Sequence, residues 1–279
     1  MRSDAPFSQR RALRLGILTS VDIRHRYLVH ALRSRFDVAA VGYEQTEYDP
    51  STATDLTPEE SRIVGRHFAE RCRQEQIYFG HESEFVSETE SCGVRMIGPG
   101  GLNSPATVDC LESHGVDTLV VYGTNLIRGP LLTRWAARIV NLHLGLSPYY
   151  RGTATNFYPL LNEEPQYVGA TIHLIDAGID SGPILKHARP TIVADDGPHT
   201  IGCKAILAGI DAMVAVLMDL SRGELRSVPQ WKAPNARLYL RKDYHPRQVV
   251  DLHRKLDAGL IPRYVERSSQ LPSPVRLVE

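Results

Sequence analysis

The segment RLGILTSVDIRHRYLVHALRSRFDVAAVG, residues 14–42, decides the fold class. Its first apolar run, 14–19, predicts a strand that ends in small residues. The apolar residues of 25–35 recur at helical spacing, and a second apolar run over 37–42 predicts another strand. Because a strand, a helix and a second strand follow one another within so short a segment, the pattern indicates a parallel α/β sheet.

The rest of the chain continues this alternation. We predict further strands at 94–97, 117–122, 138–143, 167–174 and 237–240, and further helices at 59–76, 103–113, 129–134, 198–220 and 246–256. Ser104 stands where an N-cap is expected, directly before Pro105. The expected fold is therefore α/β, a doubly wound, mostly parallel sheet with its ligand crevice beyond the carboxyl ends of the strands.

The composition of the sequence changes after Ser221: the following residues are more basic and richer in proline. We therefore expect a flexible N-terminus at 1–13, a catalytic domain at 14–221 and a small C-terminal extension at 222–279. The glycines of 98–101 lack the strand–GxGxxG–helix context, so the sequence does not support a dinucleotide site or a phosphate loop.

Overall composition narrows the class of protein. The 32 Lys and Arg residues balance the 32 Asp and Glu residues, so the chain lacks the basic surplus typical of nucleic acid binding. No apolar run reaches the roughly 18 residues of a membrane span, and Met1–Arg14 does not resemble a signal peptide. The cysteines are far apart, which favours free thiols in the cytoplasm, and the histidines show no metal-ligand spacing, so we expect no metal.

The run NLHLGLSPYYRG, residues 141–152, is the first candidate for chemistry. In a strand, Asn141 and His143 point to the same side, and at the carboxyl end of a parallel strand that side faces the ligand crevice. A carboxamide beside an imidazole suits acyl transfer to an amine, because both groups can donate to an oxyanion and the imidazole can move a proton. The alternative is that Asn141 caps the strand end and His143 is an ordinary satisfied polar residue.

A second candidate is GATIHLIDAGIDSGPIL, residues 169–185, where an alternating strand runs into a loop with two aspartates and two glycines and then into another strand. The glycines let the backbone approach a ligand closely. Asp180 in such a loop can hold an imidazolium and raise its pKa. The expected role of His173 is structural, beside the site.

Together the two runs resemble the formyltransferases that use N10-formyltetrahydrofolate, which act on glycinamide ribonucleotide, methionyl-tRNA or amino sugars. Their first signature is matched by Asn141, His143, Leu146, Pro148, Tyr150, Arg151 and Gly152. The second is matched by Gly169, Thr171, His173, Asp176, Gly178, Asp180 and Gly182. The resemblance covers roughly 14–190. It departs at Gly145, where the family has Ser, and at Ser147, where it has Leu.

The resemblance implies a Rossmann-like fold and a catalytic trio of Asn141, His143 and Asp180. It implies that N10-formyltetrahydrofolate is the formyl donor and that the turn around Gly123 and the loop after Ile175 pair with the polar edge of its pterin. The residues of the expected donor site are Gly123, Thr124, Asn125, Leu126, Ile127, Ile175, Asp176, Ala177 and Gly178. The expected acceptor contacts are Arg24, His25, Tyr150, Arg151 and Asn156.

Some of these roles have alternatives. Arg24 and His25 either bind an anion or open a solvated helix. Arg151 contacts the acceptor or clamps a loop. In the expected reaction Asn141 and His143 donate to the oxyanion while Asp180 orients and charges His143; the proton acceptor is either His143 or Asp180 through water.

The acceptor is expected to be a small-molecule amine. Residues 222–279 look too few and too irregular for the C-terminal barrel of the methionyl-tRNA enzymes, which favours a nucleotide-linked amino sugar. An amino acid or an antibiotic or siderophore amine is the alternative. Hydrolysis of formyltetrahydrofolate and a non-catalytic binding module are rival functions. The apolar residues of the extension suggest a homodimer; they are Leu238, Leu240, Val249, Val250 and Leu252.

Overall fold

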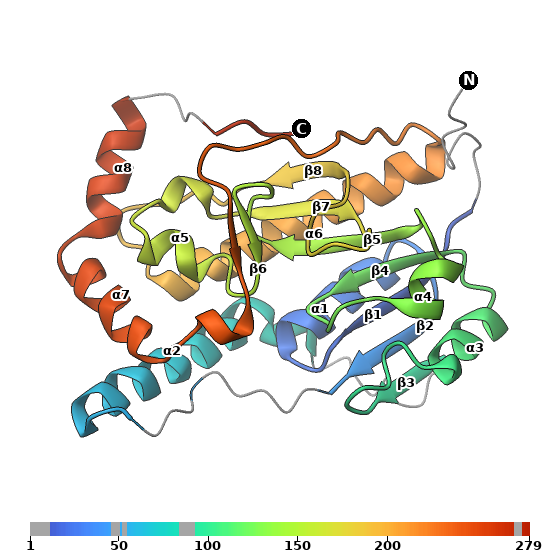
Figure 1. Ribbon diagram of the computed structural model, residues 1–279, viewed down its shortest axis with the longest axis horizontal. Coiled ribbons are helices and arrows are strands. Elements are labelled where there is room, and N and C mark those ends of the chain that lie inside the picture. Colours follow the sequence, from blue (N-terminus) through green and yellow to red (C-terminus); the bar gives the residue numbers. More distant parts are fainter. Residues whose placement is uncertain (1–11, 46–50, 52–54, 84–92, 271–274) are drawn as a thin grey trace.

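The computed structural model describes residues 12–45, 51, 55–83, 93–270 and 275–279, so the expected flexible N-terminus, 1–13, lies almost wholly outside the described residues. The described strands are β1 (Arg14–Ser20), β2 (Asp37–Glu44), β3 (Val94–Ile97), β4 (Thr118–Tyr122), β5 (Ile139–Leu144), β6 (Tyr150–Gly152), β7 (Ala170–Leu174), β8 (Ile184–Ala188) and β9 (Arg237–Tyr239). Seven of them form one sheet in the order β3-β2-β1-β4-β5-β7-β8, which crosses the middle of Figure 1. Every pair from β3 to β5 is parallel, and β7 and β8 are antiparallel additions. The predicted mostly parallel α/β fold is confirmed.

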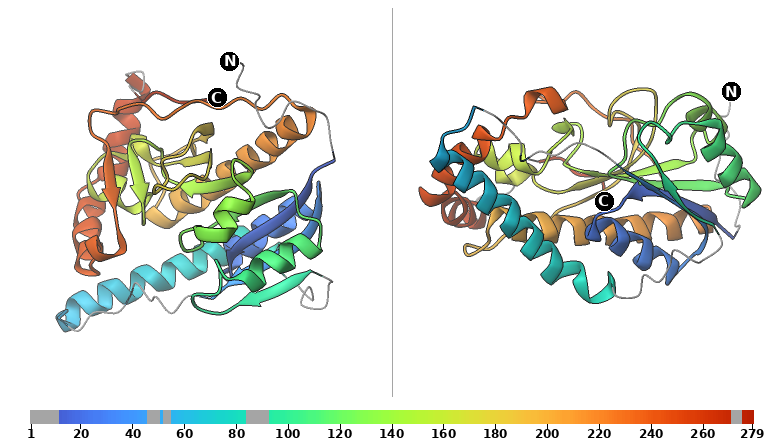
Figure 2. Two further views of the ribbon diagram at one scale, coloured as in Figure 1. Left: turned by 45° about the vertical axis from the view of Figure 1, so that its right-hand side comes forward. Right: turned by 90° about the horizontal axis from the view of Figure 1, so that it is seen from below.

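Helices cover both faces of this sheet. They are α1 (Ile23–Arg33), α2 (Pro58–Ser83), α3 (Pro105–Ser113), α4 (Gly129–Arg134), α5 (Phe157–Leu161), α6 (Pro198–Arg222), α7 (Arg247–Asp257) and α8 (Leu260–Gln270). Figure 2 shows α1, α2 and α6 on one side of the sheet and α3 on the other.

Alternation along the strands explains this two-sided cover. In β4, Val120 and Tyr122 face the core shared with α1 and α6, whereas Leu119 and Val121 face the core shared with α3 and α4. A strand buried on both faces reads as a continuous apolar run, which is why this strand is the clearest in the sequence. The predicted N-cap of α3 is also confirmed, because the Ser104 side chain accepts a hydrogen bond from the Thr107 N–H.

Among the described strands and α-helices, three were not predicted: β6, α5 and α8. The predicted strand at 167–174 begins only at Ala170, because 165–167 form a turn of 3-10 helix. Both short elements, β6 and α5, are defined by contacts with distant residues rather than by their own sequence pattern.

The C-terminal extension does not form a separate lobe. Its strand β9 pairs with β6, its helix α7 packs against Val64 of α2, and Val228 bridges Ile184 at the start of β8. The last described residues run beside β8, where the His187 N–H donates to the Val278 carbonyl over 2.7 Å.

The apolar residues of the extension bear on the expected homodimer. Val249, Val250 and Leu252 are buried inside this same chain, against α2, α5 and α6. They pack against their own chain instead of forming a subunit contact, and this part of the reasoning for a dimer is wrong. Leu238 is exposed.

Within the described ranges, α6 is the one helix long and apolar enough to cross a membrane. It carries 11 buried residues and packs along the sheet, where Gly209 lies against Ala170 of β7. This packing is that of a core helix, whose apolar face is buried by protein.

Candidate active site

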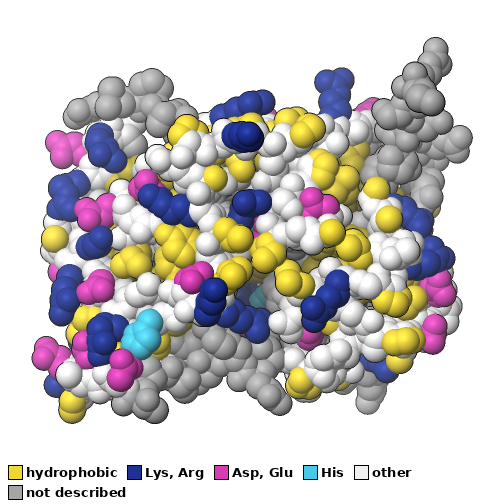
Figure 3. Space-filling view, viewed as in Figure 1, with side chains coloured by type: hydrophobic (Ala, Val, Ile, Leu, Met, Phe, Trp, Pro, Cys, Tyr) yellow, Lys and Arg dark blue, Asp and Glu magenta, His cyan; other side chains and the backbone are white. Residues whose placement is uncertain are grey.

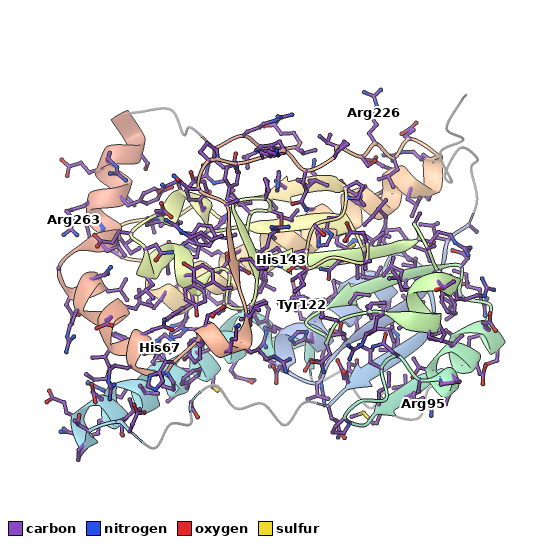
Figure 4. The ribbon with its side chains drawn as sticks, in the orientation of Figure 1. His67, Arg95, Tyr122, His143, Arg226 and Arg263 are labelled. Carbon is purple, nitrogen blue, oxygen red and sulfur yellow. The ribbon has the colours of Figure 1, made fainter. Side chains whose placement is uncertain are left out.

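Strand β5 carries the first two candidate residues. Asn141 and His143 face the side of the sheet opposite α6, while the alternate residues Val140 and Leu142 face the α6 core. The parallel pairing with β4 ends at Asn141, and beyond it β5 continues only against the antiparallel strand β7. Asn141 therefore stands at the end of the parallel part of the sheet, and His143 stands beyond it. Figure 4 shows His143 near the centre of the molecule.

The His143 ring lies between two acceptors. Its Nε2 is 3.0 Å from the Tyr150 carbonyl oxygen, and its Nδ1 is 3.4 Å from Oδ2 of Asp180. Either neutral tautomer leaves one ring nitrogen facing an acceptor without a hydrogen, and only the protonated ring satisfies both. Burial nevertheless lowers the pKa of His143 below its usual 6.5, although Asp180 and the Tyr150 carbonyl act in the opposite direction.

This balance corrects one expectation. We expected Asp180 to charge the His143 ring, but burial outweighs the attraction of the carboxylate, and the ring is neutral above its lowered pKa. A neutral imidazole can take up a proton during a reaction, and here two acceptors already stand ready for the protonated form.

Asp180 lies in the loop between β7 and β8 with a φ of 47°, which is uncommon for a residue other than glycine. Its Oδ2 accepts a hydrogen bond of 2.9 Å from the Gly152 N–H. Burial acts to raise the pKa of this carboxyl group, but the imidazoles of His143 and His173 and the Gly152 N–H together hold it well below the usual value. Asp180 is therefore ionised at neutral pH.

Asn141 is oriented by His173, the residue opposite it on β7. His173 Nδ1 lies 2.8 Å from the Leu174 carbonyl oxygen and must donate to it, so its Nε2 is free to accept from Asn141 Nδ2 over 3.0 Å. The second, longer contact of Asn141 Nδ2 is 3.4 Å to Asp180 Oδ1. His173 thus has the structural role expected of it beside the site.

Strand β6 supplies two backbone groups to the catalytic side chains, and the extension holds β6 in place. The Tyr150 carbonyl faces His143 and the Gly152 N–H faces Asp180, while β9 pairs in parallel with these same residues. The Arg237 guanidinium also contacts both the Tyr150 hydroxyl and the Glu164 carboxylate. None of these positioning contacts was predicted, because they join residues far apart in the sequence.

The extension also holds the Asp180 loop directly. Gln230 Nε2 donates to the carbonyl of Asp180 over 2.7 Å and to the carbonyl of Gly182 over 2.9 Å. A single side chain after α6 therefore fixes the backbone on both sides of Ser181. No motif pointed to Gln230.

A cavity of about 800 Å³ opens beside the trio and is lined by Asn141, His143 and Asp180 together. Figure 3 shows that this face is hollowed near its centre, where Lys and Arg side chains border a deeply set histidine. The cavity extends from the turn after β4 to α2 and the start of α6. Its size is that of a pocket for small molecules.

Most residues expected at the donor site line one end of this cavity. They are Gly123, Thr124, Asn125, Leu126, Ile127, Ile175, Asp176 and Gly178, whereas Ala177 does not line it. Two of the backbone groups expected to face a pterin are already engaged. The Asn125 N–H donates to Glu44 over 2.7 Å, and the Leu126 carbonyl accepts from Asn103 over 2.9 Å.

The expected acceptor residues divide into two groups. Arg24, His25 and Asn156 line the cavity, and the buried Nδ2 of Asn156 has no hydrogen-bond partner. Tyr150 does not line it, because its side chain is fully buried and bonded to Glu164 and Asn162 behind β6.

Arg151 does not line the cavity either. The expected acceptor contacts of Tyr150 and Arg151 are thus not supported by their positions. The His25 side chain also has a partner within the chain. Its Nδ1 lies 2.9 Å from the Thr19 hydroxyl, and burial lowers its pKa well below 6.5.

A family model described as "Formyl transferase" matches residues 50–217, a stretch that contains β5, β6 and the Asp180 loop. The chain belongs to the formyl transferase family. The family resemblance seen in the sequence is confirmed. The methionyl-tRNA formyltransferase of Synechococcus elongatus is 29% identical over 165 residues, which are 57% of this chain and 50% of that protein. The chain spans about half the length of the curated relatives it matches.

Solved formyl transferases share the fold. The phosphoribosylglycinamide formyltransferase of Anaplasma phagocytophilum has a TM-score of 0.56 at 14% identity, covering 83% of this chain and all of that one (100%). A sugar N-formyltransferase from a Shewanella species has a TM-score of 0.54 at 18% identity, covering 88% of both chains.

One departure of this chain from the family signature, Gly145, has a steric explanation. Gly145 has a φ of 149°, and a Cβ there would stand 2.6 Å from the Thr155 Cβ and 2.9 Å from the His143 Nε2. A serine there would therefore collide with the His143 imidazole and with Thr155. Ser147 is fully buried, where its N–H donates to the Thr171 hydroxyl over 2.9 Å.

Proposed function

We propose that this formyl transferase moves a formyl group from N10-formyltetrahydrofolate to the primary amine of a nucleotide-linked amino sugar. The observation that carries the proposal is that Asn141, His143 and Asp180, from two distant segments, line one cavity of about 800 Å³. Catalysis, donor binding and acceptor binding are each assigned to a different part of that cavity.

The donor fits the end of the cavity between the turn at 123–127 and the loop at 175–179. Leu126, Ile127, Ile175 and Ile179 give this end an apolar lining suited to a flat ring, and backbone groups in the same two segments suit its polar edge. When bound, N10-formyltetrahydrofolate supplies the formyl carbon and the N10 leaving group.

The side chains have distinct tasks in the proposed reaction. The amine nitrogen bonds to the formyl carbon, the bond from that carbon to N10 breaks, and the proton lost by the amine is delivered to N10. Asn141 donates its loosely held Nδ2 hydrogen, the one 3.4 Å from Asp180, to the developing oxyanion. His143 accepts the amine's proton and later releases it.

We assign the base to His143 rather than to Asp180 for two reasons. The low pKa of Asp180 makes its carboxylate a weak base, whereas the pKa of His143 lies closer to neutrality. Once protonated, His143 donates to both Asp180 and the Tyr150 carbonyl, so the ionised carboxylate stabilises the charge that develops on the ring.

The proposed acceptor class rests on the cavity beyond the trio and on the extension. The described part of 222–279 contains β9, a 3-10 turn, α7 and α8, and it forms no barrel. The space next to Asn156, Arg24 and the start of α6 is part of the same cavity as His143, which suits a long small-molecule amine with its amino group at the trio.

A product screen tests the proposal. The protein is incubated with N10-formyltetrahydrofolate and a panel of nucleotide-linked amino sugars, and mass spectrometry searches for the gain of one CO. Reactions with amino acids and with no amine run in parallel. Formylation of an amino sugar, dependent on His143, is the expected result. Formate release at the same rate without any amine would identify a hydrolase and overturn the proposal.

A further inference from the structure

Three helices form one wall of the cavity. It consists of Arg24 of α1, His67, Arg71 and Glu75 of α2, and His199 of α6, and we call it the basic wall. Figure 4 shows His67 on α2, on one side of His143 and Tyr122. All five residues line the same cavity as the catalytic trio.

The two arginines of the basic wall are paired with carboxylates. Glu75 is mostly buried, and its Oε1 accepts from Arg24 over 3.0 Å and from Arg71 over 2.8 Å. Arg24 is further held by Asp22, over 2.6 Å, at the rim of the cavity. Two carboxylates, Glu75 and Asp22, therefore face two guanidinium groups, so the basic wall offers hydrogen-bond donors rather than a net positive charge.

Donors in the basic wall remain available. The Nε of Arg71 is bonded to Glu75, but within the described parts of the chain its Nη1 and Nη2 have no hydrogen-bond partner. The buried Nε2 of His199 also has none. His67 is only 7% exposed; its Nδ1 is 3.2 Å from His253 Nε2, which leaves the opposite ring nitrogen toward the cavity.

The start of α6 adds to this set. Helix α6 has 25 residues, and Pro198, His199 and Gly202 of its first turns line the cavity. Backbone N–H groups in the first turn of a helix lack partners within the helix, and the helix dipole adds partial positive charge there. Arg71, the two imidazoles and this helix end thus converge on one region.

We propose that the basic wall binds the phosphoryl oxygens of the acceptor, that is, the diphosphate of a nucleotide-linked substrate. The diphosphate of a nucleotide-linked sugar presents four non-bridging oxygens, enough for the Arg71 fork, the imidazoles and the α6 amides together. A carboxylate has only two oxygens and would leave some of these donors without a partner. This assignment rests on the proposed function for the identity of the acceptor, but it can be tested by binding alone.

The test is calorimetric titration of the full chain, without formyl donor, with UDP, dTDP, GDP, pyrophosphate and, as a carboxylate control, glutamate. The variants are Arg71→Gln and His199→Gln, and the matched control is Arg62→Gln, an exposed arginine on the same helix that does not line the cavity. We expect at least one nucleoside diphosphate to bind, and Arg71→Gln to weaken it by about tenfold to a hundredfold. Arg62→Gln should leave the affinity unchanged.

Three outcomes would overturn the assignment: no binding of any diphosphate at millimolar concentration, equal binding by wild type and Arg71→Gln, or tighter Arg71-dependent binding of glutamate than of pyrophosphate. Thermal unfolding of each variant checks folding. If Arg71→Gln does not fold, Arg71→Lys and His199→Gln carry the measurement. Binding of tetrahydrofolate should be unaffected in every variant. Arg71-dependent diphosphate binding without formyl transfer to any amine would refute the proposed function, but the assignment of the basic wall as a diphosphate site would remain.

Discussion

Gly152→Ala is expected to damage both the stability and the chemistry of this enzyme. Gly152 has a φ of 92°, and an added Cβ would overlap the carbonyl oxygen of Tyr239 on β9. The left-handed backbone alone costs an L-residue about 1–2 kcal/mol. The overlap also forces β6 away from β9 or moves the Gly152 N–H from Asp180, whose charge-assisted hydrogen bond contributes about 1.5–3 kcal/mol.

The expected size of these effects follows from those terms. A loss of about 2–4 kcal/mol in the free energy of unfolding lowers Tm by roughly 5–15 °C in a domain of this size. Displacement of Asp180 and of the Tyr150 carbonyl should lower kcat by about tenfold or more. KM for the formyl donor should change little, because the proposed donor site is formed by other segments, the turn at 123–127 and the loop at 175–178. Differential scanning calorimetry and initial-rate kinetics measure the two effects.

The matched control is Gly65→Ala in α2. Gly65 is exposed, has no positive φ, and a Cβ there would meet nothing within 4 Å. This change should stabilise the helix by about 0.5–1 kcal/mol and leave kinetics unchanged. If Gly152→Ala kept the Tm and kcat of the wild type, the claim that β6 positions the catalytic side chains would be wrong.

Three further predictions concern the trio and the core. His143→Ala and Asp180→Asn should each lower kcat by about a hundredfold or more with folate binding retained, as measured by single-turnover kinetics and fluorescence titration; near-normal turnover would remove either residue from the mechanism. Because burial lowers the pKa of His143 and the ring must be neutral to accept a proton, kcat should fall with decreasing pH through a midpoint below 6.5, and a midpoint above 6.5 would contradict the assigned cause. In the wild type the indole Nε1 of Trp135 donates to the Val116 carbonyl over 3.1 Å, and Trp135→Phe leaves that carbonyl without a donor. The free energy of unfolding, measured with urea, should fall by about 1–3 kcal/mol. A smaller loss would mean that water reaches that carbonyl.

Acid should also destabilise the fold through buried histidines. Burial, together with His199, His253 and Arg71, lowers the pKa of His67 to about 3, so the folded state keeps this ring neutral while the unfolded chain protonates it near 6.5. Stability from this group is complete above pH 6.5 and is lost as the pH falls toward 3. His67→Gln should flatten the decline of the unfolding free energy between pH 6.5 and 4, and an unchanged slope would exclude His67 as a cause.

The sequence predicted those parts of the enzyme that depend on local patterns. The sheet strands were visible because a strand covered on both faces is continuously apolar, as in β4. Asn141 and His143 were brought together by the period of two along one strand, and Asp180 stood out between glycines in a loop after a strand. These inferences needed no knowledge of distant contacts.

The parts that escaped prediction depend on long-range pairing or on burial. Strand β6 exists because β9 pairs with it, and Gln230 reaches the Asp180 loop from 50 residues away. The sequence showed that Asp180 could raise the pKa of His143, but it did not show the burial that lowers this pKa by more. The family resemblance implied an acceptor contact for Tyr150, but its side chain lies in a polar cluster behind the strand.

The pairing of β6 with β9 has a consequence for the stage of synthesis at which the protein can become active. The ribosome makes all three catalytic side chains before it makes residues 237–239, so a nascent chain carries its reactive groups while the backbone that aims them is still unsupported. Formyl transfer should therefore begin only after the C-terminal quarter has emerged and docked, and chains stalled after α6 should fold their sheet and remain inactive.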